Sequence, residues 1–168
     1  MEHAREYGLD LGHIFAVGDS AGAHILSLYT SVLTNPSYAA EYSFRPPKGF
    51  QLQAVAFNCG AYRLKQDDPM GSLIKEILPE EKGMDRIQCL PHITEAYPPV
   101  FVMTCNGDFL KEQSLWLIDT FEEKGVDYRY HYFDPPQKTL GHVFHLNIKT
   151  IEAASCNEEQ CAFFKEFL

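Results

Sequence analysis

The sequence contains no long apolar run, no cluster of basic residues and no apolar leader at its start. No stretch approaches the about 18 apolar residues that a membrane-spanning helix needs, and residues 1–6 lack the apolar core of a signal peptide. Lys and Arg number 14 against 23 Asp and Glu, so the formal net charge is −9, and the acidic residues form no block. We therefore expect neither a membrane nor a nucleic acid as partner, because both attract clustered cations.

Paired cysteine and histidine spacings are also missing. The 5 cysteines are odd in number, and the sequence has neither C-x-x-C nor H-E-x-x-H. Cys59 and Cys105 fall within apolar, strand-like runs, which favours free thiols in a reducing compartment over a disulfide framework. The sequence thus predicts a cytoplasmic protein without a metal site.

What the sequence does contain is an alternation of apolar strands and amphipathic helices. A chain of 168 residues, 45% of them hydrophobic, is long enough for one domain with its own core. Strands are predicted at 13–17, 52–60, 99–105 and 127–133, and helices at 1–8 (a helix tail ended by Gly8), 21–33, 111–124 (ended by Gly125) and from 157 onwards. We expect an α/β fold, with a mostly parallel sheet of about four strands, flanking helices and 127–133 near an edge.

Three segments carry more specific expectations. Residues 36–50, rich in proline and aromatic residues, are predicted to be a loop. Residues 61–97 are charged and broken by prolines, with an amphipathic piece at 72–78; we interpret them as a cap or lid, the alternative being an ordinary crossover with a long loop. Residues 157–160 resemble a capping box that opens the last helix, on which Cys161, Phe164 and Leu168 share a face.

The most informative stretch is Gly18-Asp19-Ser20-Ala21-Gly22. It matches G-x-S-x-G between a predicted strand and a predicted helix, where a sharp turn lifts the serine hydroxyl clear of the sheet. Glycine at 18 and 22 would let strand and helix approach closely, and the helix N-terminus favours negative charge beside the serine. The alternative is a chance match of a short pattern. The context favours Ser20 as a nucleophile.

A serine nucleophile needs a base and a group that orients the base. In hydrolases with this elbow the chain order is Ser, then Asp or Glu, then His. Asp108 follows the strand at 99–105, and His142 follows the last strand. Asp108 could instead cap the next helix, and Asp127 and Asp134 are candidates less suited to reaching the histidine.

Several histidines compete with His142. His145 lies three residues further on, in an apolar stretch where a packed histidine is equally reasonable, and His24 lies within the helix after the elbow. The remaining histidines have no motif around them: His3, His13, His92 and His131.

Three short matches give the sequence a family resemblance. The elbow at 18–22, Asp108-Phe109-Leu110 and His142-Val143-Phe144 occur in the order seen in hormone-sensitive-lipase-like esterases, a branch of the α/β-hydrolases that includes bacterial acetyl esterases. The resemblance implies a three-layer hydrolase fold and a carboxylic-ester hydrolase. It further implies Ser20 as nucleophile, His142 as base, Asp108 as its partner and the Ala21 amide as an oxyanion donor. No cofactor is implied, the substrate is a small ester, and 61–97 would line its pocket.

The sequence also departs from that family. Its members carry an upstream H-G-G motif whose amides supply most of the oxyanion hole, and H-G-G does not occur in these residues. Residues 1–168 therefore resemble the C-terminal portion of such a domain, and we expect weak activity or none unless another chain supplies the rest. The elbow strand would have an open edge that invites self-association. A peptidase or thioesterase with the same triad, or an inert module for binding or dimerisation, is the alternative to an esterase.

Overall fold

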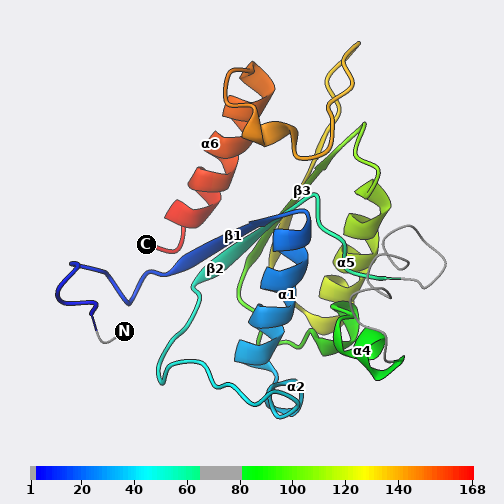
Figure 1. Cartoon of the computed structure of the whole chain (residues 1–168). Coiled ribbons are helices and arrows are strands. Elements are labelled where there is room, and N and C mark those ends of the chain that lie inside the picture. Colours follow the sequence, from blue (N-terminus) through cyan, green and yellow to red (C-terminus); the bar gives the residue numbers. More distant parts are fainter. Residues whose placement is uncertain (1–2, 65–80) are drawn as a thin grey trace.

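The computed structural model describes residues 3–64 and 81–168, and a four-stranded parallel sheet organises them. Its strands follow the chain order β1-β2-β3-β4 (Figure 1). They are β1 (Phe15–Asp19), β2 (Ala54–Asn58), β3 (Val100–Cys105) and β4 (Tyr128–Phe133). The predicted parallel α/β sheet is confirmed. Because the strands are parallel, the loops after all of them meet at one edge.

The helices lie on both faces of this sheet. They are α1 (Ala21–Thr34), α2 (Pro36–Ala39), α4 (Glu81–Arg86), α5 (Lys111–Lys124) and α6 (Ile151–Lys165), with short 3₁₀ turns η1 (Leu90–His92) and η2 (Phe144–Leu146). Figure 1 shows α1 and α5 on one side of the sheet and α6 on the other. Connections between neighbouring parallel strands are right-handed, and successive connections in the same direction along the sheet therefore put α1 and α5 on the same face.

Two apolar cores follow from these layers. Every residue of β2 and β3 is buried, and alternate side chains point to opposite faces. Phe57 and Val102 pack in the core beneath α1 and α5, whereas Phe101 and Met103 pack with α6. These two strands are apolar throughout because helices cover both of their faces. In β4 only Phe133 is fully buried, in agreement with its predicted place at an edge.

Local signals account for several helix ends. Gly125 ends α5 with φ 69°, a left-handed conformation that costs glycine little. The side chain of Asn35 accepts a hydrogen bond from the Tyr38 N–H, and Pro36 opens the short helix α2. The predicted loop at 36–50 therefore begins with a helical turn.

Other expectations were wrong in detail. Residues 3–8 form turns rather than a helix tail. The first strand spans Phe15–Asp19 instead of the predicted 13–17, so it reaches the elbow directly. The last helix begins before the predicted capping box, because Thr150 is its N-cap and accepts from the Ala153 N–H at 3.3 Å. Its buried face is not the one that Cys161, Phe164 and Leu168 were predicted to share. The helix buries Ala153, Cys156 and Phe163, while Cys161 and Leu168 are exposed.

The structure tests the segment at 61–97 only in part. Residues 65–80, including the amphipathic piece at 72–78, lie outside the described residues. Within the described part, Ala61 and Leu64 pack with Leu110 on the side where the loops after the strands meet. The cap remains a prediction.

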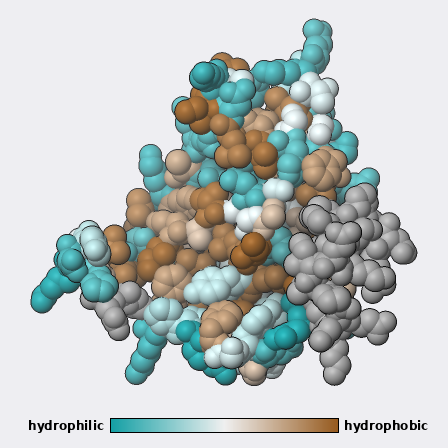
Figure 2. All heavy atoms as spheres, viewed as in Figure 1, coloured by the Kyte–Doolittle hydropathy of each residue, from teal (hydrophilic) through white to brown (hydrophobic). Residues whose placement is uncertain are grey.

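The β1 side of the sheet carries exposed apolar side chains. Among the described residues β1 pairs only with β2, and Val17 in its middle is 49% exposed. Figure 2 shows apolar residues gathered where Figure 1 places β1 and α1. No helix in the described ranges is long and apolar enough to cross a bilayer.

Candidate active site

Ser20 lies on a strained turn between β1 and α1. It has φ 54° and ψ −116°, an uncommon conformation for any residue other than glycine, and its N–H donates to the Asn58 carbonyl at 2.8 Å. A Cβ at Gly18 would lie 2.5 Å from the Gly22 carbonyl oxygen, so glycine is required there. A Cβ at Gly22 would meet no atom of the described residues within 4 Å. The predicted need for glycine therefore holds for position 18 alone.

The structure brings Ser20, His142 and Asp108 into one hydrogen-bonded chain. His142 Nδ1 lies 2.7 Å from Asp108 Oδ1, and His142 Nε2 lies 2.8 Å from Ser20 Oγ. A carboxylate only accepts hydrogen bonds, so Nδ1 carries the proton and Nε2 is free to accept the serine hydroxyl. The His142 side chain is 20% exposed and the Asp108 side chain is fully buried. The base thus faces the solvent side and the carboxylate the interior.

Asp108 is held by several donors besides the histidine. Thr104 Oγ1 donates to Oδ2 at 2.7 Å, and the Leu110 N–H donates to Oδ1 at 2.9 Å. Burial raises the pKa of the Asp108 carboxyl, but hydrogen bonds from Thr104, Leu110, His142 and Cys59 outweigh it and lower that pKa below its usual value. Asp108 therefore stays ionised beside the imidazole. Its alternative role as a helix cap is not realised, since Leu110 is the N-cap of α5.

The loops that carry Asp108 and His142 touch directly. Gly107 forms a parallel bridge with Gly141, and a Cβ at Gly107 would lie 2.4 Å from the Leu140 carbonyl oxygen. Only glycine permits this approach of backbone to backbone. The contact brings the residues next to the two glycines, Asp108 and His142, within hydrogen-bond reach.

Backbone strain gathers around the same three side chains. In the described ranges four residues other than glycine have positive φ, and three of them are Ser20, Cys59 (φ 51°) and Val143 (φ 53°). The Cys59 thiol lies within 4.8 Å of the donor atoms of Asp108 and His142, and Val143 follows His142. For β-branched Val143 this conformation is a marked outlier. Strain of this kind persists where the surroundings impose it, typically at functional sites.

Ala21, the candidate oxyanion donor, directly follows Ser20 in the chain. Ala21 is the first residue of α1, and the first N–H groups of a helix have no intrahelical acceptor. They also lie at the positive end of the helix dipole.

His145 belongs to a second network behind the elbow. Its Nε2 lies 2.8 Å from Asp19 Oδ1, and the Asn58 side chain donates to the same oxygen at 2.9 Å. The hydrogen bond from His145 lowers the pKa of Asp19, which burial alone would raise. The Asn58 side chain also donates to Gln160 of α6 at 2.9 Å. This network links the elbow to the last helix.

The histidines and aspartates that compete with His142 and Asp108 have partners or positions that do not involve Ser20. The His24 Nδ1 donates to the Ala61 carbonyl at 2.7 Å, and burial lowers its pKa. Asp134 accepts from the Asn106 side chain, and Asp127 precedes β4 at the far end of the sheet. Three histidines pair with surface carboxylates: His3 with Glu6, His13 with Asp10 and His131 with Glu159. His92 stacks on Tyr38.

Sequence reasoning missed Cys59, Thr104 and Asn58 as parts of the site. All three belong to or directly follow the buried strands β2 and β3, where they read as core residues. The register of β1 and β2, which pairs Asn58 with Asp19, places Asn58 beside the elbow. Thr104 instead reaches Asp108 within the turn that follows β3, four residues along the chain.

Cys59, Asp108 and His142 are close enough together to be considered as metal ligands, with donor atoms within 4.8 Å of one another. A hydrogen bond with Cys105, together with burial, raises the pKa of the Cys59 thiol far above its usual value. Both ring nitrogens of His142 are already engaged, Nδ1 with Asp108 and Nε2 with Ser20. The Cys59 thiol donates a weak hydrogen bond to the Met103 sulfur at 3.9 Å.

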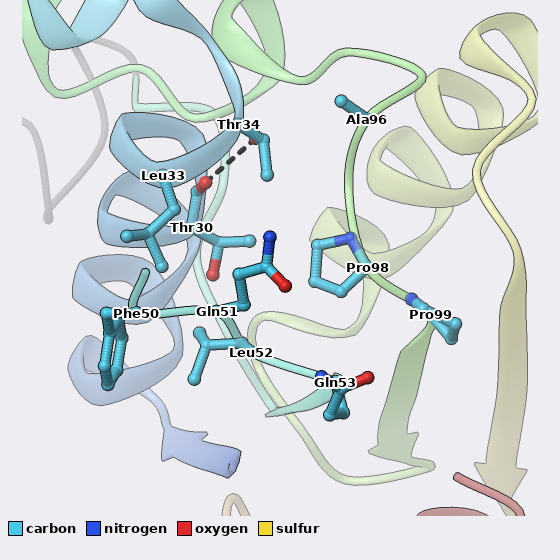
Figure 3. A pocket seen from close by; sticks show the side chains of 10 residues that line it. All are labelled: Thr30, Leu33, Thr34, Phe50, Gln51, Leu52, Gln53, Ala96, Pro98 and Pro99. Carbon is cyan, nitrogen blue, oxygen red and sulfur yellow. Dashed lines mark hydrogen bonds between the residues drawn. The ribbon is translucent and has the colours of Figure 1, made fainter. Parts of the chain in front are cut away.

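The pocket in Figure 3 lies away from this site. Thr30 and Thr34 of α1 line it, together with Gln51 and Gln53 before β2 and Pro98 before β3. It thus opens where the strands begin, whereas Ser20, Asp108 and His142 follow strand ends. None of the candidate site residues reaches it.

Comparison with known proteins identifies the fold. Esterase B from Lactobacillus rhamnosis matches with a TM-score of 0.80 and 20% identity, covering 98% of this chain and 57% of its own. Carboxylesterase Cest-2923 from Lactobacillus plantarum matches with 0.65 and 21%, covering 80% of this chain and 48% of its own. An acetyl ester-xyloside bifunctional hydrolase from Caldicellulosiruptor lactoaceticus matches with 0.72 and 16%, covering 98% and 60%.

The chain therefore spans between 48% and 60% of the length of these three proteins. A comparison with curated proteins gave no match. The family model described as alpha/beta hydrolase fold matches residues 1–146. That match covers most of the 168 residues, in agreement with the elbow motif, and the chain belongs to the α/β-hydrolase fold family.

Proposed function

We propose that the chain is the serine-bearing part of a carboxylic ester hydrolase, acting on small esters through an acyl-enzyme on Ser20. The observation that carries the proposal is the hydrogen-bonded chain from Ser20 through His142 to Asp108. Its distances lie within the range that proton transfer requires. The neighbouring esterases support the reaction class.

In this mechanism His142 acts twice. Nε2 takes the Ser20 proton as Oγ attacks the ester carbonyl, and it returns that proton to the alcohol oxygen as the ester bond breaks. A water molecule then attacks the acyl-enzyme and loses a proton to Nε2. Nε2 returns this proton to Ser20 Oγ as the bond between Oγ and the acyl carbon breaks, which releases the carboxylic acid and restores the serine hydroxyl. Asp108 keeps the imidazole in the required tautomer and stabilises its charged form throughout.

The oxyanion of each tetrahedral intermediate needs more than one donor. The Ala21 N–H supplies one of them, and removing a single donor typically lowers kcat by about 10²–10³-fold. We propose that polypeptide pairing with the open edge of β1 supplies another. This polypeptide is either an upstream part of a longer protein or a second chain, including a copy of this one.

The same three side chains also serve peptidases and thioesterases, so the substrate has to be tested. The experiment measures hydrolysis of p-nitrophenyl acetate, an acetyl thioester and an aminoacyl amide by the wild-type chain and by Ser20→Ala. We expect ester hydrolysis above the Ser20→Ala rate, and stoichiometric labelling of Ser20 by a fluorophosphonate. An unlabelled Ser20, with equal rates for both proteins, would instead favour the inert binding or dimerisation module.

A further inference from the structure

Phe109 is an apolar side chain exposed beside the proposed base. It is 72% exposed, although its neighbours Asp108 and Leu110 are buried. Its ring centroid lies 4.6 Å from that of the His142 imidazole, at an interplanar angle of 43°. The ring therefore covers part of the imidazole and leaves most of its own surface open.

The backbone holds this ring in place. The Asp108 N–H donates to the Cys105 carbonyl at 3.1 Å, and the Leu110 N–H donates to Asp108 Oδ1 at 2.9 Å. Phe109 thus sits between two residues fixed by hydrogen bonds and burial. Its position relative to His142 is set by the same turn that orients Asp108.

The chemistry of ester cleavage places one part of the substrate next to this ring. The alcohol oxygen receives its proton from His142 Nε2, so it must come within about 3 Å of that nitrogen. The group bonded to that oxygen then lies beside the imidazole, where the exposed surface of Phe109 is available. An apolar alcohol group would remove that surface from water, and a polyol, which offers less apolar area, would gain less from the contact.

We propose that Phe109 forms the alcohol-side subsite and selects esters of aryl and larger alkyl alcohols over those of small or polyhydroxylated alcohols. This inference rests on the proposed ester hydrolase function. It concerns the alcohol alone, and acyl-chain preference is independent of Phe109.

The test compares two reagents that phosphonylate Ser20 and differ in leaving group. One is a methylphosphonate with a p-nitrophenoxide leaving group, and the other is the matching fluorophosphonate, whose fluoride has no alcohol part. Rates are measured by intact mass for the wild type, Phe109→Ala and Phe109→Leu. The control is Phe44→Ala, since Phe44 is an exposed aromatic that contacts Tyr42. Each of these substitutions is at an exposed position and should leave the fold intact.

We expect Phe109→Ala to lower the aryl rate about tenfold and to leave the fluoride rate within about twofold, the size expected for lost apolar contacts in a subsite. The rate of Phe109→Leu with the p-nitrophenoxide reagent should lie between those of the wild type and Phe109→Ala, and Phe44→Ala should react like the wild type with both reagents. Benzyl alcohol should slow fluorophosphonate labelling of the wild type but not of Phe109→Ala.

Equal losses with both reagents would overturn the subsite, because they would mean that Phe109 acts only through the position of His142. Unchanged rates for both reagents would overturn it too. Absence of labelling in the wild type would overturn the proposed function, and the subsite with it.

Discussion

Two aspartate–histidine pairs lie on either side of the elbow, and they differ in what the second ring nitrogen meets. Asp108 and His142 are 2.7 Å apart, and Asp19 and His145 are 2.8 Å apart. His142 has the Ser20 hydroxyl on its other nitrogen and is partly open to solvent. His145 is buried, and its Nδ1 has no hydrogen-bond partner in the described part of the chain.

The comparison separates chemistry from support. A carboxylate beside an imidazole fixes its tautomer in both pairs, but a base also needs a proton to take and a path for the substrate. Only His142 has both. The Asp19–His145 pair ties the residue before the nucleophile to Asn58 and, through it, to α6, so we assign it to positioning the strained elbow.

The largest expected effect is the loss of His142. We expect His142→Ala to reduce kcat/KM for p-nitrophenyl acetate to the residual rate of Ser20→Ala, because residues that act as a unit fail together; in a complete triad this is roughly 10⁶-fold. The double variant should be no slower than either single variant. His131→Ala serves as the control at a surface ion pair. Additive losses in the double variant would contradict a shared step.

Replacing Asp108 tests the orienting half of the first pair. We expect Asp108→Asn to lower kcat by about 10⁴-fold, because an amide accepts the Nδ1 proton less well and stabilises the wrong tautomer. Asp134→Asn is the matched control, since Asp134 accepts from Asn106 outside the site. Steady-state kinetics on a short ester give the comparison, and a loss of tenfold or less would argue that another group orients His142.

The second pair should matter for stability more than for rate. We expect His145→Ala to lower the free energy of unfolding by about 1–3 kcal/mol, because Asp19 loses a buried hydrogen-bond partner. Activity should fall no more than about tenfold, since the contact between His142 and Ser20 remains. Urea unfolding of both proteins measures the stability. A collapse of kcat with unchanged stability would give His145 a chemical role.

The smallest effect is expected for His24, as a dependence of the free energy of unfolding on pH. Its ring meets a backbone carbonyl, and burial lowers its pKa below the usual histidine value of 6.5. The unfolded chain therefore binds a proton there more readily, so stability should decline as pH falls through 6.5, by less than the about 1.4 kcal/mol per pH unit that one proton allows. His24→Gln should make the decline between about pH 7.5 and 5.5 shallower in urea unfolding. A steeper decline would mean that the folded protein favours the charged imidazole.

The parallel sheet and the three candidate site residues could be predicted from the sequence, whereas several of their contacts could not. The strands β2 and β3 are continuous apolar runs, which is why the parallel sheet was predicted correctly. Ser20, Asp108 and His142 could be proposed because each follows a predicted strand, and parallel strands bring such positions to one edge. Position along the chain alone left His145 as a competitor of His142, and the resemblance of His142-Val143-Phe144 to the family motif favoured His142.

The errors have a common physical origin in long-range contacts. Asn157 looked like a helix cap, but its side chain donates to the His145 carbonyl at 3.0 Å within the longer helix α6. Cys59 looked like a core residue, but its thiol lies within 4.8 Å of the donor atoms of Asp108 and His142, which follow other strands. Short patterns describe local backbone preference, whereas partners distant in the chain are decided by the sheet register.

His142, and not His145, is the residue that we expect to activate Ser20. The most direct measurement is the rate of fluorophosphonate adduct formation, followed by intact mass and peptide mapping, in the wild type, Ser20→Ala, His142→Ala and His145→Ala. We predict a single adduct at Ser20 in the wild type and His145→Ala, and none in the other two over the same time. Labelling of His142→Ala at the wild-type rate, or an adduct on another residue in Ser20→Ala, would contradict the account.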